Sequence, residues 1–155
     1  MPLISRSIQT TSRRVFHDWS IAVPLSHLWW GLTNSEALPN WLGEVIAGNF
    51  VSGEVVTIQH AEDYCCTSQI QEFEPERLIV MTWQFPDEQV SHVRIMLTPG
   101  SDTTRLALTH DGLGDEATAY LPGWHTHLLY LEALLLNQPR SMNDFWSTYD
   151  GLVEL

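Results

Sequence analysis

The 155-residue sequence contains no lysine, so its seven basic side chains are all arginines. Nineteen acidic side chains outnumber them, which gives a formal net charge of −12 at pH 7. So acidic a chain is repelled by the phosphate backbone of a nucleic acid and by an anionic membrane surface. We therefore expect neither of them to be the main partner.

Cysteine is almost absent as well, since the only two are Cys65 and Cys66. Neighbouring residues of a strand point to opposite faces, so we expect neither an internal disulfide nor a shared metal site from this pair. The sequence has no apolar run near the ~18 residues of a membrane span, and residues 1–14 lack the apolar core of a signal peptide. Few cysteines fit a reducing compartment. We expect a soluble, cytoplasmic protein without a membrane span.

The motifs of common catalytic and cofactor sites are missing too. We find no glycine-rich phosphate loop, no Ser-His-Asp arrangement and no metal-ligand cluster with usable spacing. The remaining acid–base candidates are His110 and His127, with Asp111 or Glu132 as partners. Asp111 directly follows His110 and so points off the other face of its strand, while Glu132 lies off the centre of its helix face. The sequence thus predicts no catalytic residue, no metal and no cofactor, and it favours binding over catalysis.

What is present indicates one domain. Hydrophobic residues make up 44% of the chain, enough to build a single buried core over residues 13–155. Residues 1–12 are polar, and we expect them to be flexible. A strand is predicted over 13–23, and Pro24 then opens a short helix with apolar residues at helical spacing. A second short helical piece is predicted over 33–42, with Asn34 or Ser35 as its cap.

The apolar period changes to two between residues 45 and 111, where turn signals separate about five or six antiparallel strands. A long helix is predicted from near Pro122 to Asn137, ended by Pro139, and a final short helix over 141–152. The order of a strand, two short helices, antiparallel strands and a long C-terminal helix indicates an α+β fold. In that fold the long helix covers one face of the sheet.

Two histidines at the start of the long helix invite a metal-site interpretation. His125 and His127 are two residues apart, so they point about 200° away from each other on a helix and cannot hold one ion. We therefore predict that His127 faces the sheet and His125 faces away. The apolar stripe that His127 borders consists of Trp124, Leu128, Leu131 and Leu135.

Alternation also defines faces on the strands. Leu106, Leu108 and His110 share one face, and if the leucines face the helix, His110 does too. In residues 78–85 one face is apolar throughout and the other is half apolar, so alternation alone leaves open which one faces the helix. Two interpretations of His110 and His127 follow: hydrogen-bonded histidines at the edge of the core, or the few polar groups of an apolar binding pocket.

Three segments, residues 21–42, 72–87 and 104–135, together resemble the START-like helix-grip superfamily. Within it they are similar to the group named after the activator of the Hsp90 ATPase. The resemblance implies a curved antiparallel sheet wrapped around the long C-terminal helix, two short helices after the first strand, and a cavity between helix and sheet. The positions that we place at this cavity are Trp41, Trp83, Leu106, Leu108, His110, Trp124, His127, Leu128 and Leu131.

The resemblance suggests several functions. Members of the wider superfamily bind lipids, hormones or polyketides, so we expect a small lipid-like, aromatic or polyketide-like ligand. The alternatives are a chaperone-associated or other protein-binding domain, and a cyclase- or aromatase-like enzyme. The co-chaperone that gives the group its name carries an additional N-terminal domain, for which this chain has no room, and this weakens the chaperone alternative. A monomer or a homodimer fits the sequence equally.

Overall fold

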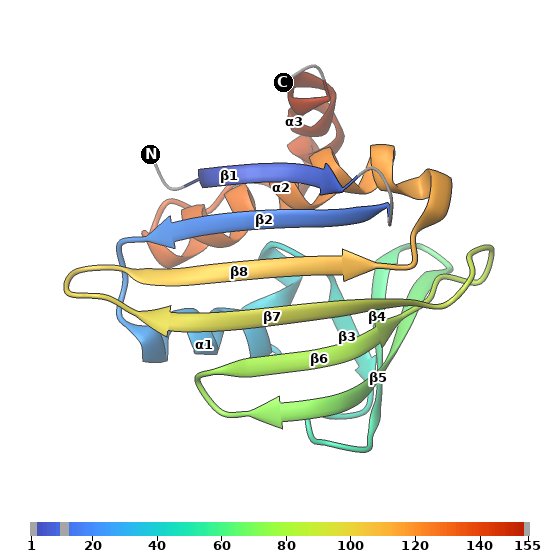
Figure 1. The fold of residues 1–155 in the computed structure, drawn as a ribbon, viewed down its shortest axis with the longest axis horizontal. Helices are drawn as coiled ribbons and strands as arrows, with labels where there is room; N and C mark the ends of the chain where they lie inside the picture. The colour runs from blue at the N-terminus through green and yellow to red at the C-terminus, as the bar shows by residue number, and fades with distance from the viewer. Residues whose placement is uncertain (1–2, 10–12, 154–155) are drawn as a thin grey trace.

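The computed structural model of the protein describes residues 3–9 and 13–153. In these ranges eight antiparallel strands form one sheet in the order β1-β2-β8-β7-β6-β5-β4-β3 (Figure 1). Each strand from β3 to β7 pairs with the next one along the chain, and β8 also pairs with β2. The strands are β1 (Leu3–Gln9), β2 (Arg14–Ile21), β3 (Glu44–Ala47), β4 (Val55–Ala61), β5 (Tyr64–Glu74), β6 (Leu78–Trp83), β7 (Ser91–Pro99) and β8 (Thr104–Asp111).

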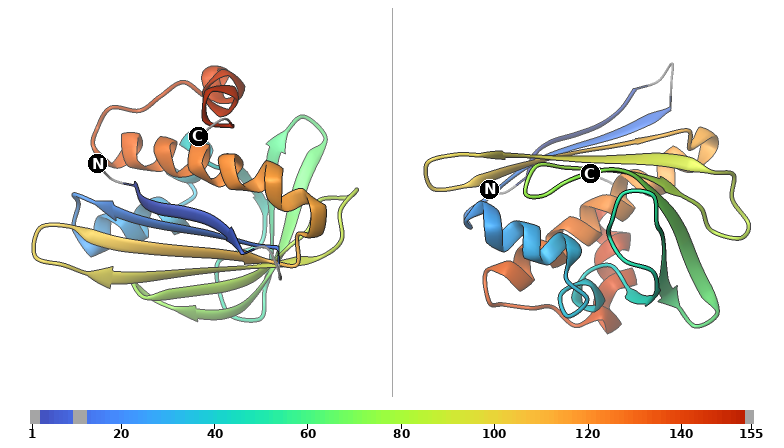
Figure 2. Two further views of the ribbon diagram at one scale, coloured as in Figure 1. Left: turned by 45° about the horizontal axis from the view of Figure 1, so that its top comes forward. Right: turned by 90° about the horizontal axis from the view of Figure 1, so that it is seen from below.

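The helices lie on one face of this sheet. Figure 2 shows α1 and α2 beneath the same face, while β4 and β5 curve away from the plane of the sheet towards the helices. The helical elements are α1 (Leu25–Thr33), η1 (Leu38–Asn40), η2 (Gly114–Glu116), α2 (Ala117–Leu135), η3 (Met142–Asp144) and α3 (Phe145–Leu152). The predicted α+β helix-grip fold is confirmed: a curved sheet holds the long helix, and α1 and η1 follow β2.

The N-terminal segment differs from the flexible segment expected over residues 1–12. Leu3–Gln9 form β1, which pairs antiparallel with β2, and Ser7 lies opposite Phe16. The sequence did not predict this strand, because polar residues such as Ser5 and Ser7 interrupt any apolar alternation. An edge strand needs only main-chain pairing on one side. Residues 1–2 and 10–12 of the expected flexible segment lie outside the described residues.

The long helix begins earlier than predicted. It starts at Ala117 rather than near Pro122, which lies inside it. A proline deprives the carbonyl four residues earlier of its helical donor, here the carbonyl of Thr118. Thr118 is exposed in the first turn, where water can bond to its carbonyl, so the helix tolerates the proline. At the other end Asn137 has a φ of 60°, and the Gln138 amide donates to the Ala133 carbonyl. This left-handed cap ends the helix close to the predicted residue.

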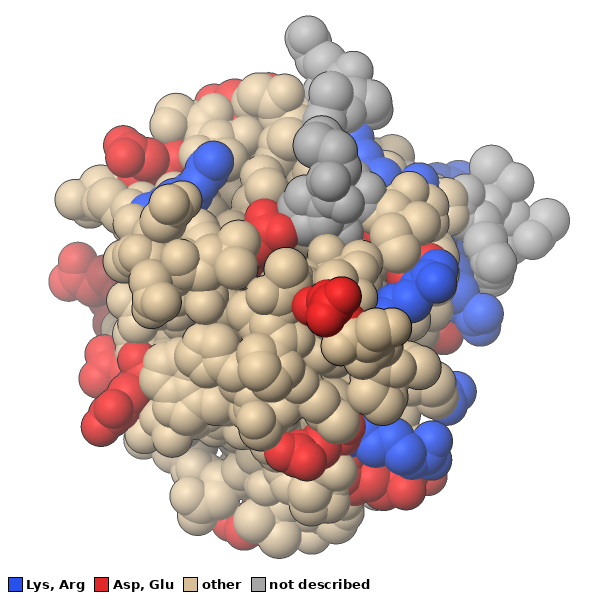
Figure 3. Space-filling model, turned by 90° about the vertical axis from the view of Figure 1, so that its left-hand side faces the viewer, with Lys and Arg blue, Asp and Glu red and all other residues tan. Residues whose placement is uncertain are grey.

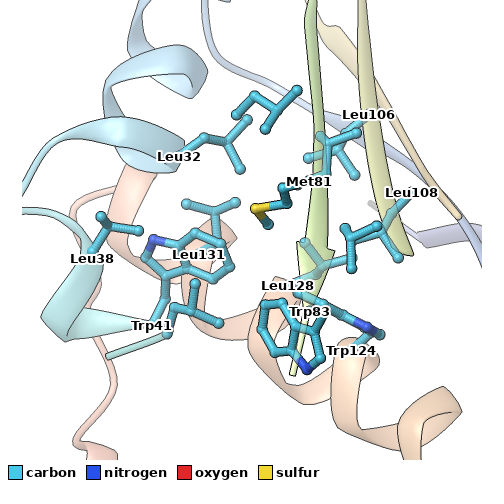
Figure 4. Close-up of a cluster of buried hydrophobic side chains, with 14 of the residues drawn as sticks. Leu32, Leu38, Trp41, Met81, Trp83, Leu106, Leu108, Trp124, Leu128 and Leu131 are labelled. Carbon is cyan, nitrogen blue, oxygen red and sulfur yellow. The ribbon is translucent and has the colours of Figure 1, made fainter. Parts of the chain in front are cut away.

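The core lies between the sheet and the helices (Figure 4). Ile79, Met81 and Trp83 are buried, whereas Thr82 on the opposite face is only half-buried, so the first set faces the helices. Helix α1 crosses α2 closely at Gly31, where an added Cβ would lie 2.8 Å from Leu131 Cδ1. The core thus has no space for a larger residue at that crossing.

The helix phase predicted that His125 faces away from the protein, but the structure buries this side chain. Its side chain is 5% exposed, and its ring meets those of His17 and Trp19 on β2 at centroid distances of 5.8 and 5.6 Å. The Nδ1 atom of His125 accepts a hydrogen bond from Arg6 on β1 at 3.1 Å. The prediction was wrong because β1 and β2 cover a second side of α2, so the buried surface of the helix is wider than a single apolar stripe.

Charge on the surface follows the composition. Figure 3 shows one side of the molecule, on which red acidic side chains are interspersed with a few blue arginines. The arginines of the described residues pair with nearby carboxylates in several places, for example Arg105 with Asp18 and Arg77 with Glu74. This side of the protein therefore offers no extended positive surface to a phosphate backbone.

Candidate ligand-binding site

A cavity of about 340 Å³ opens beside the N-terminal half of α2. The sheet side of the cavity is built by Tyr64 at the start of β5, Trp83 at the end of β6, and Phe85 just after it. Helix α2 borders it with Ala119 and Gly123, whose small size recesses the helix surface there; a Cβ on Gly123 would meet only Tyr149, at 3.9 Å. The hollow therefore arises where small helix residues face large strand residues.

Helix α3 supplies the remaining wall. Phe145 is buried and its ring lies 4.6 Å from that of His127 on α2, while Trp146 is 69% exposed at the rim. Tyr149 also lines the cavity, and its hydroxyl donates to the Ala119 carbonyl at 3.2 Å. The strands β5 and β6, helix α2 and helix α3 thus place aromatic rings around one cavity.

Aromatic rings of the cavity lining contact one another directly. Trp83 and Trp124 approach to a centroid distance of 5.1 Å, and Tyr64 stacks on Phe85 at 4.3 Å with the planes 6° apart. Such contacts hold the rings in fixed positions and add about 0.5–1.5 kcal/mol each beyond area burial. The aromatic walls are therefore largely pre-formed.

One chain of hydrogen bonds crosses the lining. Trp83 Nε1 donates to the hydroxyl of Tyr120 at 3.1 Å, and that hydroxyl donates to Glu88 Oε1 at 2.7 Å. Burial, together with the bond to Glu88, raises the pKa of Tyr120 well above its usual range, so the phenol keeps its proton. Burial also raises the pKa of Glu88. The Tyr120 hydroxyl thereby gives its one hydrogen to Glu88 and has none left for a ligand.

His110 lies in the core and does not line the cavity. Its Nδ1 accepts from Trp124 Nε1 at 2.9 Å, and because an indole only donates, the imidazole proton is on Nε2. Nε2–H then donates to Ser91 Oγ at 2.7 Å, and that hydroxyl donates to the Trp83 carbonyl. Burial lowers the pKa of His110 to about 3, so the ring is neutral. For His110 the hydrogen-bonded core interpretation describes the structure.

His127 and His60 are different, because both line the cavity. His127 Nδ1–H donates to the Trp41 carbonyl at 2.7 Å, which leaves the lone pair of Nε2 free in the neutral ring. His60 on β4 has its Nε2 enclosed without a hydrogen-bond partner among the described residues. The two rings are 6.1 Å apart at 77°, and burial lowers the pKa of His127 to about 4 and that of His60 to about 3. Two neutral imidazoles therefore border the cavity together.

Of the positions predicted at the cavity, the structure places Trp83, Trp124 and His127 in its lining. The others are fully packed in the core, because the cavity lies at one end of α2 and the middle of the helix presses directly on the sheet (Figure 4). These core positions are Trp41, Leu106, Leu108, His110, Leu128 and Leu131.

Sequence reasoning missed His60 and all of the α3 residues. A signal for His60 was present, since Val56, Ile58 and His60 alternate along β4 and the first two are buried. The α3 residues carried no such signal, because the fold-back of α3 onto α2 follows a loop whose course no pattern predicts. Phe145, Trp146 and Tyr149 read only as parts of a short terminal helix.

Metal, thiol and membrane features are sparse in the described ranges. No three His, Cys, Asp or Glu side chains there are grouped as metal ligands. Burial raises the pKa of Cys66 to about 12, so its thiol stays protonated. Among the helices described, none is long and apolar enough to cross a membrane.

A curved antiparallel sheet gripping a long C-terminal helix, with an aromatic cavity at one end of that helix, places the protein in the helix-grip class of α+β domains. The family model for the activator of Hsp90 ATPase homolog 1-like protein matches residues 22–135. The chain belongs to this family, as the resemblance predicted. No curated protein matches the sequence.

Solved structures share the fold at low sequence identity. CalU16 from Micromonospora echinospora has a TM-score of 0.77 and 19% identity, with 97% of this chain and 91% of that chain covered. Protein MLL2253 from Mesorhizobium loti has a TM-score of 0.74 and 22% identity, over 83% of this chain and 100% of that one. DynU16, a protein of the dynemicin biosynthetic locus, has a TM-score of 0.75 and 19% identity over 81% of this chain. This chain covers only 48% of DynU16.

Proposed function

We propose that the protein binds a small, apolar, ring-containing molecule in the cavity between α2, α3 and the ends of β4 to β6. The observation that carries the proposal is the aromatic lining of a space of about 340 Å³. Small-molecule pockets of ~300–1,000 Å³ are typically lined by hydrophobic and aromatic side chains with a few polar groups. This cavity has that size and composition, at the small end of the range.

The lining favours flat ring systems over flexible chains. Aromatic side chains from the sheet and from two helices offer ring faces and edges for stacking, and burial of apolar ligand surface contributes ~25 cal/mol per Å² before association costs. Glu88 and Glu116 border the cavity and no arginine does, so a ligand anion finds no partner charge there. The lining therefore disfavours an anionic ligand.

The descriptions of the similar proteins point to two different roles. DynU16 is described as a putative protein in the dynemicin biosynthetic locus, whereas the family description refers to activation of the Hsp90 ATPase. We favour the small-molecule role because this chain itself forms a cavity lined by aromatic side chains. Cytoplasmic location, a chaperone or other protein partner, a cyclase-like activity and the choice between monomer and homodimer stay predictions.

Removal of the exposed ring at the rim tests the proposal. Trp146→Ala should weaken binding of N-phenyl-1-naphthylamine, a neutral dye that brightens in apolar surroundings, by about 2- to 10-fold, since one aromatic contact is worth ~0.5–1.5 kcal/mol. The melting temperature should hardly change, because Trp146 is 69% exposed. Fluorescence titration of the dye measures the affinity directly.

Trp30→Ala is the matched control. Trp30 lies on α1, stacks on His27 at 5.5 Å and is not part of the cavity lining, so its removal should leave the dye affinity unchanged. Saturable dye binding that weakens only in Trp146→Ala supports the site. No saturable binding, or equal weakening in both variants, would show that the dye does not use this cavity.

A further inference from the structure

The indole and phenol hydrogens around the cavity are nearly all donated to acceptors within the protein. The Trp124 indole donates to His110, the Trp83 indole to Tyr120, and the Tyr120 hydroxyl to Glu88. The remaining phenols are occupied as well, since Tyr64 donates to Asp87 and Tyr149 to the Ala119 carbonyl. Inside the described part of the chain, Nε2 of His60 and Nε2 of His127 are lining nitrogens without a partner. The indole of Trp146 also has none there, but it lies exposed at the rim.

The two imidazoles have complementary hydrogen-bonding roles. Nδ1–H of His127 is held by the Trp41 carbonyl, so Nε2 of this neutral ring can only accept. His60 makes no such fixed bond through Nε2 and can carry its proton there, so it can donate. A half-turn of the His60 ring about Cβ–Cγ exchanges Nε2 with Cε1, which gives this ring two ways to turn a nitrogen towards the cavity.

The group that fits an acceptor and a donor together is a hydroxyl, which both donates and accepts. The centroid distance of 6.1 Å leaves room for one oxygen atom bonded to a nitrogen of each ring at ordinary lengths of ~2.8 Å. A carboxylate fits worse, because it only accepts and its charge would lie near Glu88 and Glu116 without any cation in the lining. An unsubstituted hydrocarbon would leave the His60 nitrogen as unpaired as it is without a ligand, so it would gain no hydrogen bond where a hydroxyl gains one.

We propose that the cavity selects neutral ring compounds that carry a hydroxyl group, and that this hydroxyl is held between the imidazoles of His60 and His127. This inference rests on the proposed function, because it assumes that a ring compound occupies the cavity. It adds the chemical class of the ligand and the two side chains that recognise it. The sequence suggested His127 as a polar group of the pocket, but it paired His127 with His110 rather than with His60.

Competition with N-phenyl-1-naphthylamine against three matched probes tests the inference. Naphthalene, 2-naphthol and 2-naphthoate share one ring system and differ in carrying no polar group, a hydroxyl or an anion. We expect 2-naphthol to bind about tenfold more tightly than naphthalene, as two hydrogen bonds of ordinary net strength allow, and 2-naphthoate to bind more weakly than 2-naphthol. Shifts of the imidazole nitrogen resonances of His60 and His127 on addition of 2-naphthol should report the contact.

Variants separate hydroxyl recognition from general affinity for rings. His60→Phe keeps a flat ring but removes both nitrogens, so the preference for 2-naphthol over naphthalene should fall to about twofold or less, while naphthalene binds as before. His92→Phe is the control, because it makes the same substitution at an exposed histidine of β7 that is not part of the cavity lining. It should leave the preference intact.

The outcomes distinguish this inference from the proposed function. If neither the dye nor any naphthalene probe binds, the proposed function itself fails. If the probes bind but naphthalene equals 2-naphthol, or 2-naphthoate binds as tightly as 2-naphthol, the cavity exists but the hydroxyl recognition is refuted. A preference that survives in His60→Phe, or the absence of imidazole shifts in the wild-type protein, refutes it equally.

Discussion

Trp124→Ala should lower the free energy of unfolding by about 4 kcal/mol or more. Truncation of a buried aromatic residue costs ~3–5 kcal/mol in lost burial and cavity formation. The side chain of Trp124 is 1% exposed, its ring contacts Trp83, and its Nε1 donates to His110 Nδ1. Loss of that donor leaves an enclosed acceptor unpaired, which adds ~1–3 kcal/mol. For a domain of ~5–15 kcal/mol total stability, urea unfolding should show a largely destabilised protein.

The same substitution at Trp146 is the control for this prediction. Trp146 is 69% exposed, so Trp146→Ala should change the unfolding free energy by no more than about 0.5 kcal/mol. Trp124→Phe separates the two contributions, because it keeps most of the apolar contact and loses the indole donor. Similar losses for Trp124→Ala and Trp146→Ala would mean that Trp124 does not anchor α2 on the sheet.

The helix phase and the strand alternation predicted much of the core. Trp124, Leu128 and Leu131 are buried as their spacing indicated, and Leu106 and Leu108 face them from β8. These predictions succeeded because one element presses on one broad apolar face, so a local period reports burial. The edge strand β1 and the buried His125 were missed for the opposite reason. Their environment is made by the pairing of two polar strands and by a second covered side of the helix.

The candidate site was predicted less well than the core because a cavity is a failure of packing at one place, and no local period encodes it. The space beside Gly123 is bounded by Tyr149 of α3, which would lie 3.9 Å from a Cβ added to the glycine. The glycine alone therefore does not define the cavity. His110 shares the alternation of Leu106 and Leu108, which left a core and a cavity interpretation open, and the family resemblance implied the cavity. Its two hydrogen bonds, to Trp124 and Ser91, place it in the core instead.

Acidification from pH 7 to pH 5 should strongly destabilise the protein, because the core holds several imidazoles that fold in the neutral form. Burial lowers the folded-state pKa of each, to about 3 or 4, and the ordinary pKa of 6.5 returns when the chain unfolds. The most enclosed are His17, His60, His110 and His127. His17 repeats the His110 arrangement: Nδ1 accepts from Trp19 Nε1, and Nε2–H donates to the Leu121 carbonyl. Protonation of Nδ1 would break the indole bond in both rings.

The sign follows from proton binding in the two states. Between about pH 7 and pH 5 an unfolded imidazole takes up most of a proton and a folded one with its pKa near 4 takes up little, so the unfolded chain gains stability as the pH falls. Each histidine of this kind contributes a loss of about 2 kcal/mol over that interval. Even half of the combined effect of four, ~4 kcal/mol, is a large part of a domain's ~5–15 kcal/mol. The raised pKa of the partly exposed Glu88 acts in the opposite direction and offsets little of it.

Urea unfolding at a series of pH values measures the effect as the slope of unfolding free energy against pH, which gives the number of protons taken up on unfolding. His110→Asn keeps an acceptor for Trp124 at the position of Nδ1, loses the donor to Ser91 and cannot titrate, so it should lower that number by about one near pH 5.5. Nitrogen resonances of the four imidazoles in the folded protein should show no titration above pH 5. A flat stability profile from pH 7 to pH 5, or folded-state titration of these rings near pH 6.5, would mean that the imidazoles are not held neutral by burial.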